Sequence, residues 1–278
     1  MNKGKKKTGK IIGEIIFALC TVLIWVPMYY LLISAFKVRG DIVKYPLQPM
    51  FEKMTLDNFS KAIVKMQFFA SVRNTGFITI FALLMVVVFG ALAGFALSRI
   101  KKKGFQAYYA FIVAIMVVPF IGVFIALIKQ TVIMKIYGSI WAAVLIQAAW
   151  NMPFAIFLYT GFIGALPKEL EESAYVDGCT MLRTFTDIFL PLLAPVTATC
   201  LIRSGVGIWN DYLVGISILS STYNPTVMVG VSKFFGERVN EYGLAFAAVL
   251  LASLPFIILF IFLQKYFIKG LTAGAVKG

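Results

Sequence analysis

The sequence contains no histidine and only three cysteines, and charged residues account for 14% of its 278 residues. Histidine and cysteine are the side chains that most often build zinc sites and Cys/His nucleophile pairs. Because both are scarce, we expect neither a metal site nor catalysis within this chain. The cysteines show no spacing typical of a disulfide framework and are interpreted as free thiols: Cys20, Cys179 and Cys200.

Apolar residues, by contrast, dominate the chain: 60% are hydrophobic and the mean hydropathy is +0.89. A soluble domain of this length could not bury so much apolar surface, so the composition predicts a multispan membrane protein. The formal net charge of +14 would suggest nucleic-acid binding in a soluble protein. Here the basic residues lie at the ends of apolar runs, where membrane topology is specified. We therefore expect membrane lipid, and no nucleic acid, around this chain.

The N-terminal segment 1–10 is rich in lysine and is expected to be a cytoplasmic tail. Part of it, Gly4–Lys10, resembles a phosphate-binding loop. The final lysine is followed by Ile11 rather than by serine or threonine, and no strand precedes the loop. Nucleotide binding is therefore not expected. A cleavable signal peptide is not expected either, since the first apolar run is long and contains Glu14.

The apolar runs predict an all-α polytopic fold with six membrane-spanning helices in a domain covering 11–269. The expected spans are about 11–36, 72–97, 105–128, 139–162, 191–220 and 243–267. Lysine and arginine concentrate in the tail, in the tight loop 99–103 and after the sixth span, which predicts that these parts are cytoplasmic. Six spans then place both termini in the cytoplasm. The polar segments 37–71 and 222–242 are expected outside.

An acidic stretch, residues 163–190, separates the fourth and fifth spans and is cytoplasmic in this topology. Pro167 suits the first position of a helix, and the acidic residues after it suit the positive end of the helix dipole. Gly178 can end that helix in a left-handed conformation. The stretch therefore predicts a short helix that is suited to docking on a soluble partner.

The spacing in this stretch resembles the EAA motif of the membrane permeases of binding-protein-dependent ABC importers. The matching positions are Glu172, Ser173, Ala174, Gly178, Ile188, Leu190 and Pro191, with Ser173 standing where the family usually has alanine. The sequence Trp209-Asn210-Asp211 and the C-terminal stretch from Gln264 to Gly278 look like the carbohydrate subfamily, typified by a maltose permease subunit.

The resemblance implies a type I permease subunit in a bacterial or archaeal cytoplasmic membrane that pairs with a second homologous permease. Two ATPase subunits are expected inside, and an extracellular binding protein is expected to deliver a sugar. ATP and magnesium would then be bound by the ATPases, and no cofactor by this chain. An ion-gradient-driven secondary transporter is the alternative, although the few acidic residues cluster outside the spans and no internal repeat is evident. A membrane-embedded enzyme is disfavoured by the lack of histidine.

The resemblance also implies that the acidic stretch couples the permease to the ATPase. The residues expected to do so are Glu172, Ser173, Ala174, Asp177, Gly178, Leu190 and Pro191. Glu172 is the best candidate for gripping a basic group, and Ala174 and Gly178 are expected on one helical face because they lie four residues apart. The tail 270–278 is expected to be flexible and to reach the ATPases, with a frayed terminus as the alternative.

Four residues of the fifth span are candidates for the transport pathway. Arg203 lies roughly 18 Å along this span, where a charged residue usually faces a bundle interior or an aqueous cavity. It could bind sugar hydroxyls or a carboxylate, or it could pair with the partner permease or with Asp211. Trp209 could stack on a sugar ring or be an interfacial tryptophan. Asn210 and Asp211 could line the pathway or hold a helix end.

Overall fold

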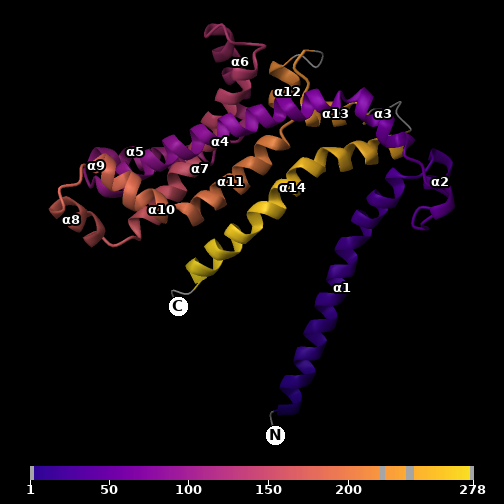
Figure 1. Cartoon of the computed structure of the whole chain (residues 1–278), viewed down its shortest axis with the longest axis horizontal. Helices are drawn as coiled ribbons and strands as arrows, with labels where there is room; N and C mark the ends of the chain where they lie inside the picture. Colours follow the sequence, from indigo (N-terminus) through magenta and orange to yellow (C-terminus); the bar gives the residue numbers. More distant parts are fainter. Residues whose placement is uncertain (1–2, 220–222, 236–240, 276–278) are drawn as a thin grey trace. The chain divides into compact units, whose positions relative to one another are not determined.

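The computed structural model describes residues 3–219, 223–235 and 241–275, and the regular elements within these ranges are all helices (Figure 1). The helices belong to two units, each described here by itself. The first unit comprises Met1–Phe68 and Gly230–Ser253, and the second comprises Phe69–Val229 and Leu254–Gly278.

The first unit contains the long helix α1, Lys3–Ala35, which agrees with the expected first span. Its section Lys10–Ala35 is long and apolar enough to cross a membrane, and the section is exposed within the chain except at its C-terminal end, where Ile33, Ser34 and Ala35 are buried. Such a helix is apolar on all sides, as expected for one surrounded by lipid or by other subunits. The polar segment that follows contains three short helices: α2 (Arg39–Lys44), the 3-10 helix η1 (Phe51–Lys53) and α3 (Asp57–Lys65).

Lys37 holds this polar segment against the end of α1. Its side chain is buried, and its Nζ donates to the carbonyl oxygens of Tyr45 at 2.7 Å and of Pro46 at 3.3 Å. Burial lowers the pKa of Lys37, and the nearby Asp41 carboxylate opposes this effect. Asn58 in α3 donates to the carbonyl oxygen of Lys37 at 2.9 Å. The segment is thus a folded cap rather than a loose loop.

The second unit is organised around two long helices, α4 (Phe68–Arg99) and α7 (Ile140–Gly164), which agree with the expected second and fourth spans. They cross at two glycines of α4. A Cβ built on Gly90 would lie 2.8 Å from the Cβ of Ala155, and one on Gly94 would lie 2.5 Å from the Cβ of Tyr159. Small residues four apart allow the backbones of membrane helices to approach closely. The buried Tyr159 hydroxyl then pairs with the Thr197 hydroxyl at 2.9 Å.

The expected third span, 105–128, is not one helix but two. Helix α5 (Lys103–Ile115) and helix α6 (Phe120–Ile133) meet at an angle of 105°. Pro119 lies at the start of α6 and explains the break. Proline disfavours the helical conformation of the residue before it and has no N–H to donate.

The expected fifth span, 191–220, also differs from the prediction. The chain is already helical before it, through α9 (Met181–Arg183), the π-helical turn η2 (Thr184–Phe189) and α10 (Leu190–Leu192). A bend of 72° leads to α11, Ala194–Trp209, which ends eleven positions before residue 220. The short helix α12, Leu213–Ile218, follows.

Helix α13 (Val227–Ser232) precedes the long α14 (Tyr242–Ala275), which contains the expected sixth span. The tail was expected to be flexible from residue 270, but α14 continues through Ala275; residues 276–278 lie outside the described part. By length and composition, three helices of the described chain could cross a membrane, or five if each bent pair forms one span. The structure is therefore an all-helical membrane protein, and the count of six spans stays a prediction.

Candidate functional site

The acidic stretch forms the short helix α8, Glu169–Val176, as predicted. In Figure 1, α8 and α9 lie at the opposite end of the second unit from α6 and α12. Three glutamates occupy the first turn of α8, where the helix dipole favours negative charge. Pro167 lies two positions before the first helical residue instead of at that position, a difference within the usual uncertainty of helix ends.

Gly178 ends α8 as predicted, with a left-handed φ of +76°. The N–H of Gly178 donates to the carbonyl of Tyr175 at 3.0 Å, and that of Cys179 donates to the carbonyl of Ala174 at 2.9 Å. This pair of bonds is the Schellman motif, which satisfies the last carbonyls of a helix. The expectation that Ala174 and Gly178 share a helical face is wrong, because Gly178 lies beyond the helix. Ala174 is buried, whereas a Cβ on Gly178 would meet nothing within 4 Å.

Two neighbouring glutamates of α8 have different surroundings. Glu172 is exposed, whereas Glu171 forms an ion pair with Arg99 at the end of α4. Sequence reasoning counted Arg99 only as one of the basic residues that set membrane topology and missed this contact. The available signal was the residue type: position 99 is an arginine, whereas the basic residues that follow it in this loop are lysines. Arginine is favoured over lysine for partly buried ion pairs.

An exposed apolar surface adjoins this helix. Tyr175 and Val176 at the end of α8, with Met181 and Leu182 in α9, are each at least 60% exposed. Tyr175, Val176 and Met181 also line a groove whose wall includes Phe95 of α4. Neighbouring exposed apolar side chains of this kind indicate an interaction surface.

The remaining predicted coupling residues lie in α8, at its C-terminal end and in α10. Ser173 is exposed, and its hydroxyl donates to the carbonyl of Glu169 at 2.8 Å. Asp177 is the exposed residue that follows the last residue of α8. Leu190 and Pro191 are exposed in α10, next to the π-helical turn, and the Leu190 N–H donates to the carbonyl of Phe185 five residues earlier. Apart from Ala174, the predicted coupling residues are thus accessible.

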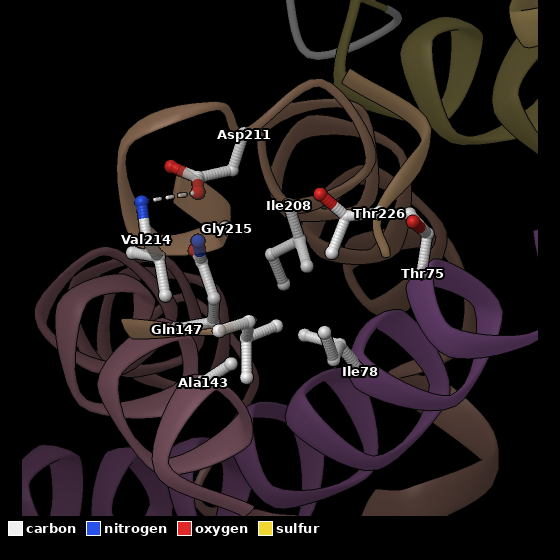
Figure 2. Close-up of a pocket in the computed structure, with 10 residues that line it drawn as sticks. Thr75, Ile78, Ala143, Gln147, Ile208, Asp211, Val214, Gly215 and Thr226 are labelled. Carbon is white, nitrogen blue, oxygen red and sulfur yellow. Dashed lines mark hydrogen bonds between the residues drawn. The ribbon is translucent and has the colours of Figure 1, made fainter. Parts of the chain in front are cut away.

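The candidates at the end of α11 have structural contacts. Figure 2 shows Asp211 and Val214 on the rim of a pocket, joined by a hydrogen bond from the Val214 N–H to Asp211 Oδ1 at 2.8 Å. The same carboxylate accepts hydrogen bonds from the Gly215 N–H and from the Gln147 side chain. Asp211 therefore fixes the start of α12 and connects it to α7. This agrees with the expected role of holding a helix end.

Asn210 is the C-cap residue of α11, and Trp209 before it is buried. The Trp209 ring centre lies 6.3 Å from that of Phe256, so the ring packs within the second unit. These positions favour a structural role over direct contact with a sugar.

Arg203 is exposed on α11 beside an aromatic pocket. Its Nη1 donates to Asn151 Oδ1 at 3.1 Å, and its Cζ lies 4.6 Å from the centre of the Phe154 ring. Trp150 and Met116 complete the wall. In the described chain Arg203 pairs with a neutral amide and does not form the expected alternative ion pair with Asp211. The guanidinium therefore retains donors that can serve a ligand or another subunit.

Residues 86–273 match the family described as "Binding-protein-dependent transport system inner membrane component", and the chain belongs to this family. It is thus a multi-pass, non-catalytic component of an inner-membrane transport system. Membership decides against the ion-gradient-driven secondary transporter. The fold agrees with that of a bacterial ABC transporter involved in the import of the acidic polysaccharide alginate, with a TM-score of 0.79, 18% identity, and coverage of 96% of this chain and 99% of that chain.

Relatives of similar length support the assignment. The chain is 38% identical over 279 residues to the melibiose/raffinose/stachyose import permease protein MelC of Bacillus subtilis, with 100% of both chains covered. It is 31% identical to the diacetylchitobiose uptake system permease protein DasC of Streptomyces coelicolor, with 91% of both chains covered. It is also 30% identical to the maltodextrin transport system permease protein MdxG of Bacillus subtilis, covering 97% of this chain and 96% of that one.

Proposed function

We propose that this chain is one of two homologous permease subunits of an ATP-driven importer that carries an oligosaccharide across a bacterial or archaeal cytoplasmic membrane. The named substrates of its relatives, which include melibiose, diacetylchitobiose and maltodextrin, support the substrate class. An extracellular binding protein delivers the sugar. Two ATPase subunits inside bind ATP and magnesium, and this chain binds no cofactor.

The proposed topology has six spans and both termini in the cytoplasm. Its spans are α1, α4, the bent pair α5–α6, α7, the bent pair ending in α11, and α14. The exposed lysines of the loop 101–103 after α4 support a cytoplasmic position for that end of the second unit. Helix α8, whose residues resemble the EAA motif, lies at the same end, because Glu171 pairs with Arg99.

The helix α8 docks in a groove on an ATPase subunit and receives its movement. The carrying observation is the exposed surface of α8 and α9, where Glu172 lies beside Tyr175, Val176 and Met181 in one groove wall. A short helix with exposed apolar residues fits the helix-in-groove mode of recognition. Glu172 then pairs with a basic group of the ATPase. The C-terminal tail from residue 270, which resembles that of the maltose-type subunit, makes a second contact.

The charge reversal Glu172→Lys tests this docking. It is expected to abolish sugar uptake and ATPase co-purification while leaving the chain inserted, because a like charge would face the basic group of the partner. The control Glu52→Lys places the same reversal on the exposed part of η1 and is expected to keep the ATPase bound. Normal ATP-driven uptake by the Glu172→Lys importer would contradict the proposed docking of α8.

Arg203 is proposed to line the sugar pathway, with Trp209, Asn210 and Asp211 holding the α11–α12 turn that shapes it. A guanidinium with spare donors beside aromatic side chains matches the usual composition of a small-molecule site, which is mostly apolar with a few polar groups. The substitution Arg203→Gln is expected to raise the KM for uptake about tenfold, consistent with the loss of a charged hydrogen bond. An unchanged KM and substrate range would assign Arg203 to a contact with the partner permease instead.

A further inference from the structure

One arginine joins several parts of the acidic stretch to the end of α4. The Arg99 guanidinium pairs with Glu171 of α8 and donates to the carbonyl oxygen of Leu166, before α8, at 3.5 Å. Its Cζ lies 5.3 Å from the centre of the Phe189 ring, in the π-helical turn after α8. A single side chain therefore contacts the segment before, within and after the docking helix.

The ion pair is shielded from solvent. The side chains of Arg99 and Glu171 are 8% and 29% exposed, whereas those of the pair between Lys10 and Glu14 in α1 are 79% and 65% exposed. Exposed pairs are screened by water and salt and fix little geometry. Loss of one partner of a shielded pair leaves the other charge uncompensated, so the pair resists separation.

The α4 end of this connection is rigid as well. The Phe95 ring, one turn before Arg99, packs at 5.0 Å from the Phe189 ring and at 5.4 Å from the Phe185 ring. Gly94, the residue directly before Phe95, packs against the backbone of α7. A displacement of α8 thus meets packed helices at Arg99 and cannot be absorbed by a loose loop.

We propose that Arg99 is a positioning residue that fixes α8 to the end of α4, so that a movement of α8 displaces α4 and α7 together. This inference rests on the proposed function of α8 as the docking helix. The two adjacent glutamates then have different roles: Glu172 faces the ATPase, and Glu171 fixes α8 to α4 of the same chain.

The test uses the whole importer in proteoliposomes, with its ATPase and binding protein, and measures sugar taken up per ATP hydrolysed alongside the ATPase that co-purifies. Arg99→Gln and Glu171→Gln are expected to lower uptake per ATP about tenfold while the ATPase stays bound. Arg99→Lys keeps the charge without the planar guanidinium and is expected to be intermediate. Lys101→Gln and Glu14→Gln remove the same charges from exposed side chains and should leave the ratio unchanged.

The double variant Arg99→Glu/Glu171→Arg restores an ion pair and is expected to recover about half of the lost coupling, a rescue that a general loss of stability would not produce. Should the Arg99 variants fail to accumulate in the membrane, Glu171→Gln decides the outcome, because it leaves Arg99 in place. Normal uptake per ATP in both single glutamine variants overturns the proposal, and so does a double variant no better than either single reversal. Failure of docking itself is distinguishable, because Glu172→Lys would then leave the ATPase bound.

Discussion

The crossing of α4 and α7 predicts a large effect for a single methyl group. In Gly94→Ala the new Cβ would lie 2.5 Å from the Cβ of Tyr159, 3.0 Å from the backbone nitrogen of Thr160 and 3.1 Å from the backbone carbon of Tyr159. Two of these neighbours are backbone atoms, and none can move by rotating a side chain. Restoring ordinary contact distances requires the helices to separate by about 1 Å, which forfeits a quarter to a half of the dispersion energy of each contact.

We expect Gly94→Ala to destabilise the second unit by about 2 kcal/mol, although alanine is favoured over glycine in a helix by about 1 kcal/mol. The measurement is thermal unfolding of the purified importer in detergent, followed by tryptophan fluorescence. At about 2–4 °C per kcal/mol, Tm should fall by about 4–8 °C. The control is Gly161→Ala in α7, where nothing lies within 4 Å of the new Cβ and Tm should hold or rise slightly. A Gly94→Ala variant that melts at or above the unaltered Tm would refute this account of the crossing.

Two further substitutions test local geometry. Gly178→Ala forces an alanine to φ +76° and is expected to weaken the end of α8 by about 1 kcal/mol, reducing the ATPase that co-purifies, while Gly178→Asn should lose less because asparagine tolerates that conformation. Equal retention of the ATPase by the unaltered protein and by both Gly178 variants would contradict this expectation. Asp211→Ala removes the acceptor of three hydrogen bonds and is expected to cost about 1–3 kcal/mol, seen as a lower Tm with the KM for sugar unchanged. A raised KM at normal Tm would instead place Asp211 in direct contact with the sugar.

Much of the architecture follows from local properties of the sequence. Uninterrupted apolar length predicts α1 and α4, and the ends of α8 follow from its glutamates and from Gly178. The breaks were harder to predict because hydropathy does not register them. Pro119 lies inside an apolar run, so the run reads as one span although the backbone turns there. The polar pair Asn210-Asp211 likewise indicated the end of α11, but the apolar residues on both sides of it made the run read as one span.

Contacts between distant residues could not be read from the sequence. Arg99 and Glu171 lie 72 positions apart in the sequence (171 − 99), and only the packing of α4 against the acidic stretch brings them together. Likewise, adjacent glutamates are chemically equivalent in the sequence, and their different orientations arise from where α8 lies. The sequence predicted a short acidic helix, and the tertiary structure determines which of its charges faces inward.

The π-helical turn between residues 184 and 189 has a consequence for spacing. A π turn contains one residue more than an α turn, and each residue of an α-helix advances the rotation by about 100°. The turn therefore takes up one extra residue between α9 and α10, so these flanking segments keep nearly the relative rotation of a continuous α-helix. Deleting one residue there would restore an ordinary α-helix with little rotation of α9 relative to Pro191, whereas deleting two would rotate α9 by about 100°. The π turn thus makes the orientation of this segment tolerant of the loss of one residue but not of two.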